Sequence, residues 1–146
     1  AWFFHTPGLI IVYPSSPYEA KGLLCASFED PNPVMYFEHK MMYRSISEEI
    51  PDDYYTIEIG KANLVRKGED ISIITYGMGV YWSLNAAKNF PGQVEIIDLR
   101  TLNPLDHDKM NEVAERHGKV MFVTEESVES NFTLGLAGRL QRDNFQ

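Results

Sequence analysis

The sequence predicts an α/β protein with three layers, in which helices cover both faces of a mostly parallel sheet. Two observations lead to this fold class. Short runs of apolar and β-branched residues recur along the chain, and segments with helical periodicity separate them. The 146 residues, 44% hydrophobic and 23% charged, have the balance of a globular chain. We expect this domain over residues 57–146, after the last βαβ part of another domain over residues 1–38.

The first βαβ unit begins with an apolar run at residues 9–13, typical of a strand buried on both faces. Ser16-Pro17-Tyr18-Glu19 has the form of a capping box, in which Ser16 caps a helix and Glu19 reaches back to the cap. Residues 30–33 end this helix, and residues 34–37 form a second buried strand parallel to the first. The helix should bury one apolar face made of Ala20, Leu23, Leu24 and Phe28.

Residues 39–56 lack a clear period and become acidic, so we interpret them as an interdomain linker. After a short apolar stretch at 62–65, strands are predicted at residues 71–76, 94–99 and 119–124. Three helices alternate with them. Asp106 should cap the second of these helices and Gly118 should end it. Their apolar positions are Val80, Leu84 and Ala87, then Met110, Val113 and Ala114, then Phe132, Leu136, Ala137 and Leu140.

Charge and composition exclude several classes of function. The net charge of −8 and the pI of about 4.9 disfavour nucleic acid as a partner. No apolar run approaches the roughly 20 residues that span a bilayer, so no membrane partner is expected. With Cys25 as its single cysteine, the chain forms no internal disulfide, which fits a reducing compartment. Both ends look like the interior of a longer chain, so we expect a fragment.

A glycine turn offers one functional hypothesis. Gly77-Met78-Gly79 follows a predicted strand and opens a helix, and Asp98 lies at the end of the next strand. This arrangement is typical of a Rossmann-type nucleotide-binding domain. Trp82 occupies the third glycine position, where close packing requires a minimal side chain, and therefore argues against a dinucleotide site. The alternative is a tight turn that needs glycine for its backbone angles.

Histidines and acidic groups offer weaker signals. His5 precedes a buried strand, where it would line a cofactor cleft or simply pack in a turn, whereas His107 and His117 should be solvated. The charged residues at 98–106 follow a strand at the edge where open α/β sheets usually bind ligands or partner domains. The alternative is that Arg100 pairs with a nearby acid and Asp106 only caps its helix. Glu125 and Glu126 leave the next strand at the same edge, which favours a solvated or interface role over acid–base catalysis. Spacing alone therefore assembles no active site.

Several segments, taken together and in order, resemble the β subunits of branched-chain 2-oxo-acid and pyruvate dehydrogenases, in the transketolase-like superfamily. The resemblance covers nearly the whole chain. The matching segments are Ala-Trp-Phe-Phe-His-Thr-Pro-Gly-Leu (1–9), Pro-Ser-Ser-Pro-Tyr-Glu-Ala-Lys-Gly-Leu-Leu (14–24), Glu-Asp-Pro-Asn-Pro-Val (29–34), Phe-Glu-His-Lys (37–40), Ile-Gly-Lys-Ala (59–62), Ile-Asp-Leu-Arg-Thr-Leu-Asn-Pro-Leu-Asp (97–106) and the Thr-Glu-Glu near 125.

The resemblance implies a subunit of the thiamine-diphosphate-dependent decarboxylating component, which oxidatively decarboxylates a 2-oxo acid and passes the acyl group to a lipoyl arm. Residues 1–38 would be the tail of a pyrimidine-binding domain, and 57–146 a truncated carboxyl-terminal domain. The family's catalytic histidine and glutamate would lie upstream of Ala1, so we assign no catalytic or cofactor-binding residue here. The family's chain would continue past Gln146, which predicts an unfinished sheet edge. Residues 36–44 favour branched-chain substrates.

The resemblance also implies ligands and partners. Thiamine diphosphate and magnesium belong to the intact enzyme and are not expected on this chain. A potassium site would use oxygens of Ser27, Asp30 and Asn32, although the Asp-Pro-Asn-Pro loop alone is equally explained as a turn that ends a helix. Implied partners are an α-type subunit or half, a second β-type subunit and a lipoyl acyltransferase core. The location would be the bacterial cytoplasm or the mitochondrial matrix.

Overall fold

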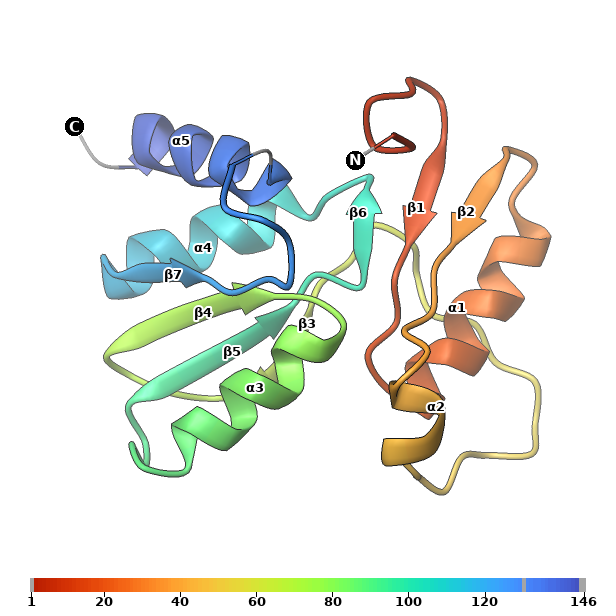
Figure 1. Ribbon diagram of the computed structural model, residues 1–146, viewed down its shortest axis with the longest axis horizontal. Helices are drawn as coiled ribbons and strands as arrows, with labels where there is room; N and C mark the ends of the chain where they lie inside the picture. The colour runs from red at the N-terminus through yellow and green to blue at the C-terminus, as the bar shows by residue number, and fades with distance from the viewer. Residues whose placement is uncertain (1, 130, 145–146) are drawn as a thin grey trace.

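The structure, a computed structural model, describes residues 2–129 and 131–144 and contains two sheets side by side (Figure 1). The larger one, which we call the second sheet, has the strand order β3-β5-β4-β7. Strand β4 pairs in parallel with β5 and β7, and β3 is an antiparallel edge strand. The strands are β3 (Asn63–Arg66), β4 (Ile71–Thr75), β5 (Val94–Asp98) and β7 (Val120–Phe122).

Helices cover both faces of the second sheet. Helix α3 (Met78–Ala87) packs on one face, whereas α4 (His107–His117) and α5 (Phe132–Asn144) lie on the other (Figure 1). All five residues of the central strand β5 are buried between these layers. The three-layer arrangement with a mostly parallel sheet is therefore confirmed.

The caps of α4 explain where that helix begins and ends. The Asp106 side chain accepts a hydrogen bond from the Lys109 amide at 3.1 Å, and Gly118 adopts the left-handed conformation with φ of 64°. Both ends of the helix were predicted correctly from these two residues. Asp106 also accepts from the Ala62 amide at 3.0 Å, and this second bond ties the start of β3 to α4.

The smaller first sheet has the order β2-β1-β6. Strands β1 (Ile10–Val12) and β2 (Val34–Tyr36) pair in parallel around helix α1 (Pro17–Glu29), as predicted. Strand β6 (Thr101–Asn103) was not predicted: it follows β5 in sequence but pairs antiparallel with β1. The chain thus sends a strand from the second sheet into the first, which joins the two sheets covalently and by hydrogen bonds.

Helix α1 buries a different face from the predicted one. Ser16 caps it as expected, accepting from the Glu19 amide at 3.2 Å, and Leu23 is fully buried. Leu24 and Phe28 are exposed instead, Phe28 by 83%. The buried side of the helix faces the returning chain, because Tyr55 and Ile57 pack directly against Gly22.

Residues 39–57 contain a helical turn that the sequence did not indicate, α2 (Met42–Ser45). The chain then runs back along α1. The Lys21 ammonium donates to the carbonyl oxygens of Asp52 and Asp53 at 3.1 and 2.9 Å, and the Ile57 amide donates to the Gly22 carbonyl at 3.0 Å. Within the described part of the chain, no helix combines the length and apolar character needed to cross a bilayer.

Candidate functional site

A buried polar cluster joins the two sheets where the start of α1 meets the end of β5. We call Ser15, Glu19, Asp98 and Arg100 the carboxylate cluster. Asp98 has no exposed surface, and Ser15 and Glu19 are also buried. The Ser15 hydroxyl lies 2.9 Å from Glu19 Oε2 and also within hydrogen-bond contact of Asp98 Oδ2. One hydroxyl has one proton to donate, so one of the two carboxyl groups must donate in turn.

The surroundings of the two acids favour Asp98 as this donor. Burial, followed by the negative charge of Glu19, raises the pKa of Asp98 well above its ordinary value. Glu19 lies beside a cation, because Arg100 Nε lies 3.5 Å from Glu19 Oε1. Arg100 therefore pairs with a nearby acid, one of the two interpretations that the sequence left open. The Asn63 amide also donates to Glu19, at 3.1 Å, so the cluster connects α1, β3 and β5.

The role of Glu19 differs from the capping box that the sequence predicted. Its carboxylate accepts from the Ser15 amide at 3.3 Å rather than reaching back to the amide of Ser16. Arg100 completes the loop with a left-handed backbone, φ 56°, and donates its amide to Asp98 Oδ1 at 3.0 Å. These contacts connect the two sheets through hydrogen bonds, and burial makes the carboxyl groups inaccessible to a substrate.

The glycine turn does not form a nucleotide site. Asp98, which would have to reach a ribose, is fully buried and bonded to Ser15 and Arg100. The turn itself is covered, because a Cβ on Gly77 would collide with the ring of Tyr13. Gly77 has φ of 55° and Gly79 packs against Thr75, so both glycines serve the tight strand-to-helix turn. The Rossmann alternative is therefore wrong.

The predicted cation loop is a compact turn at the end of α1. Asp30 Oδ1 accepts from the backbone amide and the side-chain amide of Asn32, both at 2.9 Å. The Ser27 hydroxyl donates to the Leu23 carbonyl at 2.7 Å, which leaves its lone pairs free to accept a cation. The structure thus places all three residues around one turn, and potassium binding there stays a prediction.

Glu95 forms a second buried ionic group, near the amino-terminal ends of β4 and β5 in the second sheet. Arg116 donates to both of its oxygens, at 2.8 and 2.7 Å, and the Ser72 hydroxyl donates at 3.0 Å. His117 lies beside them with only 4% of its side chain exposed, so the prediction that His117 is solvated was wrong. The last turn of α4 folds over the sheet edge, where the His117 ring contacts the Glu69 carbonyl at 3.0 Å. These groups border a cavity of about 510 Å³.

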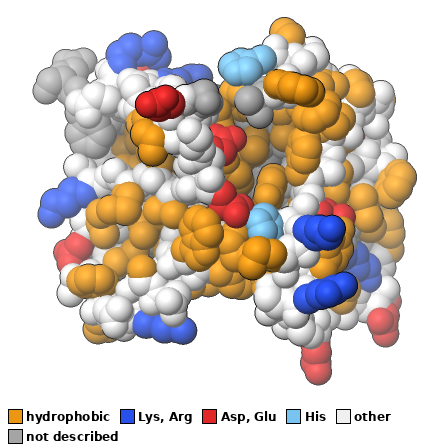
Figure 2. Space-filling model, viewed as in Figure 1, with side chains coloured by type: hydrophobic (Ala, Val, Ile, Leu, Met, Phe, Trp, Pro, Cys, Tyr) orange, Lys and Arg blue, Asp and Glu red, His pale blue; other side chains and the backbone are white. Residues whose placement is uncertain are grey.

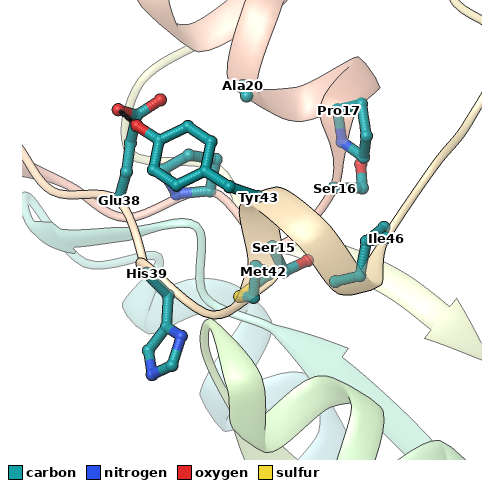
Figure 3. Close-up of a pocket in the computed structure, with 10 residues that line it drawn as sticks. Ser15, Ser16, Pro17, Ala20, Glu38, His39, Met42, Tyr43 and Ile46 are labelled. Carbon is teal, nitrogen blue, oxygen red and sulfur yellow. Dashed lines mark hydrogen bonds between the residues drawn. The ribbon is translucent and has the colours of Figure 1, made fainter.

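A cavity of about 290 Å³ lies between the start of α1 and α2 (Figure 3). Its walls are mostly apolar, and Tyr43 closes one side by donating a hydrogen bond to Glu38. The His39 ring points away from Tyr43 (Figure 3), and its Nε2 lies 3.0 Å from Glu125 Oε1. Glu125 thus contacts a histidine of the same chain, and its solvated or interface role stays a prediction. The apolar wall consists of Pro14, Pro17, Ala20, Met42 and Ile46.

No constellation of three or more histidine, cysteine, aspartate or glutamate side chains that could hold a metal occurs among residues 2–129 and 131–144. Cys25 is free and half-buried. The polar clusters in this part of the chain connect secondary-structure elements and expose no catalytic pair of acids.

Comparison with known proteins identifies the family. Residues 60–146 match the model of the transketolase C-terminal domain. The 2-oxoisovalerate dehydrogenase subunit β of Bacillus subtilis (strain 168) is 47% identical over 134 residues, which cover 90% of this chain and 41% of that protein. The pyruvate dehydrogenase E1 component subunit β of Staphylococcus aureus (strain Mu50) is 49% identical over 123 residues, 82% of this chain and 38% of that protein.

A third relative, the acetoin:2,6-dichlorophenolindophenol oxidoreductase subunit β of Cupriavidus necator, is 41% identical over 146 residues, 98% of this chain and 43% of that protein. The chain thus spans about two-fifths of the length of these curated relatives. A solved split-gene transketolase, an inactive β4 tetramer, superimposes with a TM-score of 0.79 at 21% identity over 97% of this chain and 47% of that one, which shows the shared fold. The match over residues 60–146 establishes that this chain belongs to the transketolase C-terminal domain family.

Proposed function

We propose that the chain is part of the β-type half of a thiamine-diphosphate-dependent 2-oxo-acid dehydrogenase. The intact enzyme would oxidatively decarboxylate a branched-chain 2-oxo acid or pyruvate and transfer the acyl group to a lipoyl arm. One observation carries this proposal: two β subunits named for such dehydrogenases are 47% and 49% identical to this chain over 90% and 82% of its length. Because that identity extends through most of the chain, it includes residues of both sheets.

The glycine turn and the carboxylate cluster do not fit a site for thiamine diphosphate or magnesium. A diphosphate site would need an open glycine turn at a helix start, but Tyr13 covers Gly77. A magnesium site would need accessible carboxylate oxygens, but Asp98 and Glu19 are buried and hydrogen-bonded. We therefore propose that the cofactor is held by other parts of the enzyme, and that this chain supplies scaffold and subunit contacts.

We extend the proposal to potassium at Ser27, Asp30 and Asn32. The support is chemical, because a hydroxyl, a carboxylate and an amide oxygen within one turn are hard ligands suited to such a cation. Replacing Asp30 with alanine in the intact enzyme should abolish any difference in melting temperature between potassium and sodium buffers. A difference that survives the substitution would place the cation elsewhere.

The partners we propose are an α-type subunit or half, a second β-type subunit and a lipoyl acyltransferase core. Exposed aromatic side chains support a role in assembly, because Trp2 is 88% exposed and Phe28, Tyr43 and Tyr54 also project from the surface. For the cellular location we propose the cytoplasm of a bacterium or the mitochondrial matrix of a eukaryote.

A chimeric enzyme tests the proposed function. Residues 1–146 would replace the matching segment of the Bacillus subtilis 2-oxoisovalerate dehydrogenase β subunit, co-produced with its partner subunit. We expect turnover of 2-oxoisovalerate or pyruvate, and the ratio of their kcat/KM values would identify the preferred side chain. A folded chimera that assembles but turns over acetoin and neither 2-oxo acid would contradict the proposal. The unmodified Bacillus enzyme is the matched control.

A further inference from the structure

A third cavity lies between the two sheets, and its walls are made largely of aromatic rings. It has a volume of about 250 Å³ and lies where the amino-terminal segment, β1, the end of β4 and the start of α5 meet. Figure 2 shows the corresponding hollow between the two halves of the molecule, with hydrophobic and acidic side chains in it. The rings that line the cavity are Phe3, Phe4, Tyr13, Phe37, Tyr76 and Phe132.

The six rings form one continuous chain around the cavity. Each centroid lies between 4.7 and 6.4 Å from the next, and the closest pair is Phe4 and Phe132. Tyr13 and Tyr76 meet edge to face at 5.4 Å, and this contact links the two sheets. Followed from one ring to the neighbour that it contacts, the series is Phe3, Phe37, Tyr13, Tyr76, Phe132 and Phe4.

Acidic groups complete the lining. Glu125 and Glu126 border the cavity together with His5, Ile11 and Leu102, and none of the described residues that line it is lysine or arginine. The negative charges act on the rings: burial first, and then Glu125, raises the pKa of Tyr13. Burial also raises the pKa of Tyr76 to about 12, with further contributions from Glu126 and Glu125. The carboxylates therefore lie close enough to the aromatic wall to share a ligand with it.

The aromatic rings and the carboxylates that line the cavity both favour a positively charged ligand. The face of an aromatic ring carries partial negative charge and attracts cations, most strongly when water is excluded. Carboxylates add a full negative charge, whereas anionic ligands would be repelled by both. Glu126 accepts from the Phe132 amide at 3.3 Å and contacts no side-chain cation in the described residues, so its charge is available to a ligand.

We propose that this aromatic cavity binds a small alkylammonium cation. Its volume lies below the roughly 300–1,000 Å³ of sites for drug-sized ligands, which suits a compact group such as a substituted ammonium. The six rings surround the methyl groups, and Glu126 neutralises the charge. This site is separate from the carboxylate cluster and from the predicted cation loop, and it does not depend on the proposed function.

Choline and its uncharged isostere 3,3-dimethylbutan-1-ol form the test, because the two differ only by replacement of nitrogen with carbon. We expect calorimetric titration of the 146-residue chain at pH 8 to show saturable binding of choline, with the isostere at least about fivefold weaker. Equal affinities for the two compounds would show that the cavity recognises apolar shape and not positive charge, and would overturn the proposal. Absence of saturable choline binding would overturn it as well.

Two variants locate the binding. Glu126→Gln should weaken choline at least about threefold without changing the affinity for the isostere, since it removes charge and keeps shape. Glu129→Gln, on the same loop but outside the cavity, is the matched control and should bind like the parent chain. Equal choline affinity in the parent and both variants, each verified as folded by circular dichroism, would place the cation away from this cavity.

Discussion

Replacing Asp98 with asparagine should remove the pH dependence that this buried acid imposes on stability. Folding raises the pKa of Asp98, because burial and the nearby charge of Glu19 disfavour its ionised form. Between the unfolded and folded pKa values, the folded chain therefore binds one more proton than the unfolded chain. Its contribution to stability is complete below the unfolded pKa and is lost as the pH rises through the folded one.

The magnitude follows from this proton count. One full proton corresponds to about 1.4 kcal/mol per pH unit, beginning near pH 4, where an unfolded aspartate ionises. Asparagine has nearly the shape of the protonated acid. Its oxygen can still accept from the Arg100 amide, now 3.0 Å from Asp98 Oδ1, and its N–H can donate to Ser15. The variant should thus keep the joint between the sheets while removing the titration.

Urea denaturation of both chains at pH 5, 6, 7 and 8 measures the effect. The free energy of unfolding of Asp98→Asn minus that of the parent should increase with pH by up to about 1.4 kcal/mol per unit. Other titrating groups cancel in this difference, provided that both chains unfold in two states. A difference that stays constant from pH 5 to 8 would refute the assignment of the proton to Asp98.

Two further predictions concern packing and charge in the second sheet. Gly79→Ala should lower the free energy of unfolding in urea by about 1–3 kcal/mol, because the new Cβ would overlap the buried Thr75 hydroxyl. Gly135→Ala is the control: a Cβ there meets open space in a helix, so this variant should raise the free energy of unfolding by about 0.5–1 kcal/mol. The opposite order would contradict the packing described. Arg116→Ala should cost about 1–3 kcal/mol, since it leaves Glu95 buried without its cation; the 43% exposure of Arg116 keeps this below the loss for a fully buried pair. A loss under about 0.5 kcal/mol would show that Glu95 needs no partner.

Local sequence patterns predicted the second sheet well. The β4 and β5 runs, Ile71–Thr75 and Val94–Asp98, are rich in isoleucine and valine, and Asp106 and Gly118 mark both ends of α4. These signals are local, since apolar runs and caps act within a few residues of the chain. The elements between them could therefore be placed without knowledge of the fold.

The missed features depend on contacts between distant residues. Strand β6 has three residues and is defined by pairing with β1, which lies about 90 residues away. Phe28 is exposed because the returning chain packs against another face of α1. Helical spacing shows which residues share a face of the helix, but it does not show which face the rest of the chain covers. Glu19 looked like a capping residue, whereas in the structure it meets Arg100, from the loop between β5 and β6.

The resemblance supplied the family, and local chemistry alone could not. The buried acids, the tight glycine turn and the polar loop after β5 each have a structural explanation in this chain. Sequence reasoning also missed the aromatic cavity, because its rings come from five separate segments between Phe3 and Phe132. The strongest signal that could have indicated it was the Phe3-Phe4-His5 sequence next to a buried strand.

The central claim is that this chain provides scaffold while the thiamine diphosphate site lies on other parts of the enzyme. Calorimetric titration with thiamine diphosphate and magnesium tests it directly, using the 146-residue chain and the assembled Bacillus chimera side by side. We expect no binding to the chain alone and saturable binding to the chimera. Saturable binding of thiamine diphosphate to the isolated chain would contradict the account.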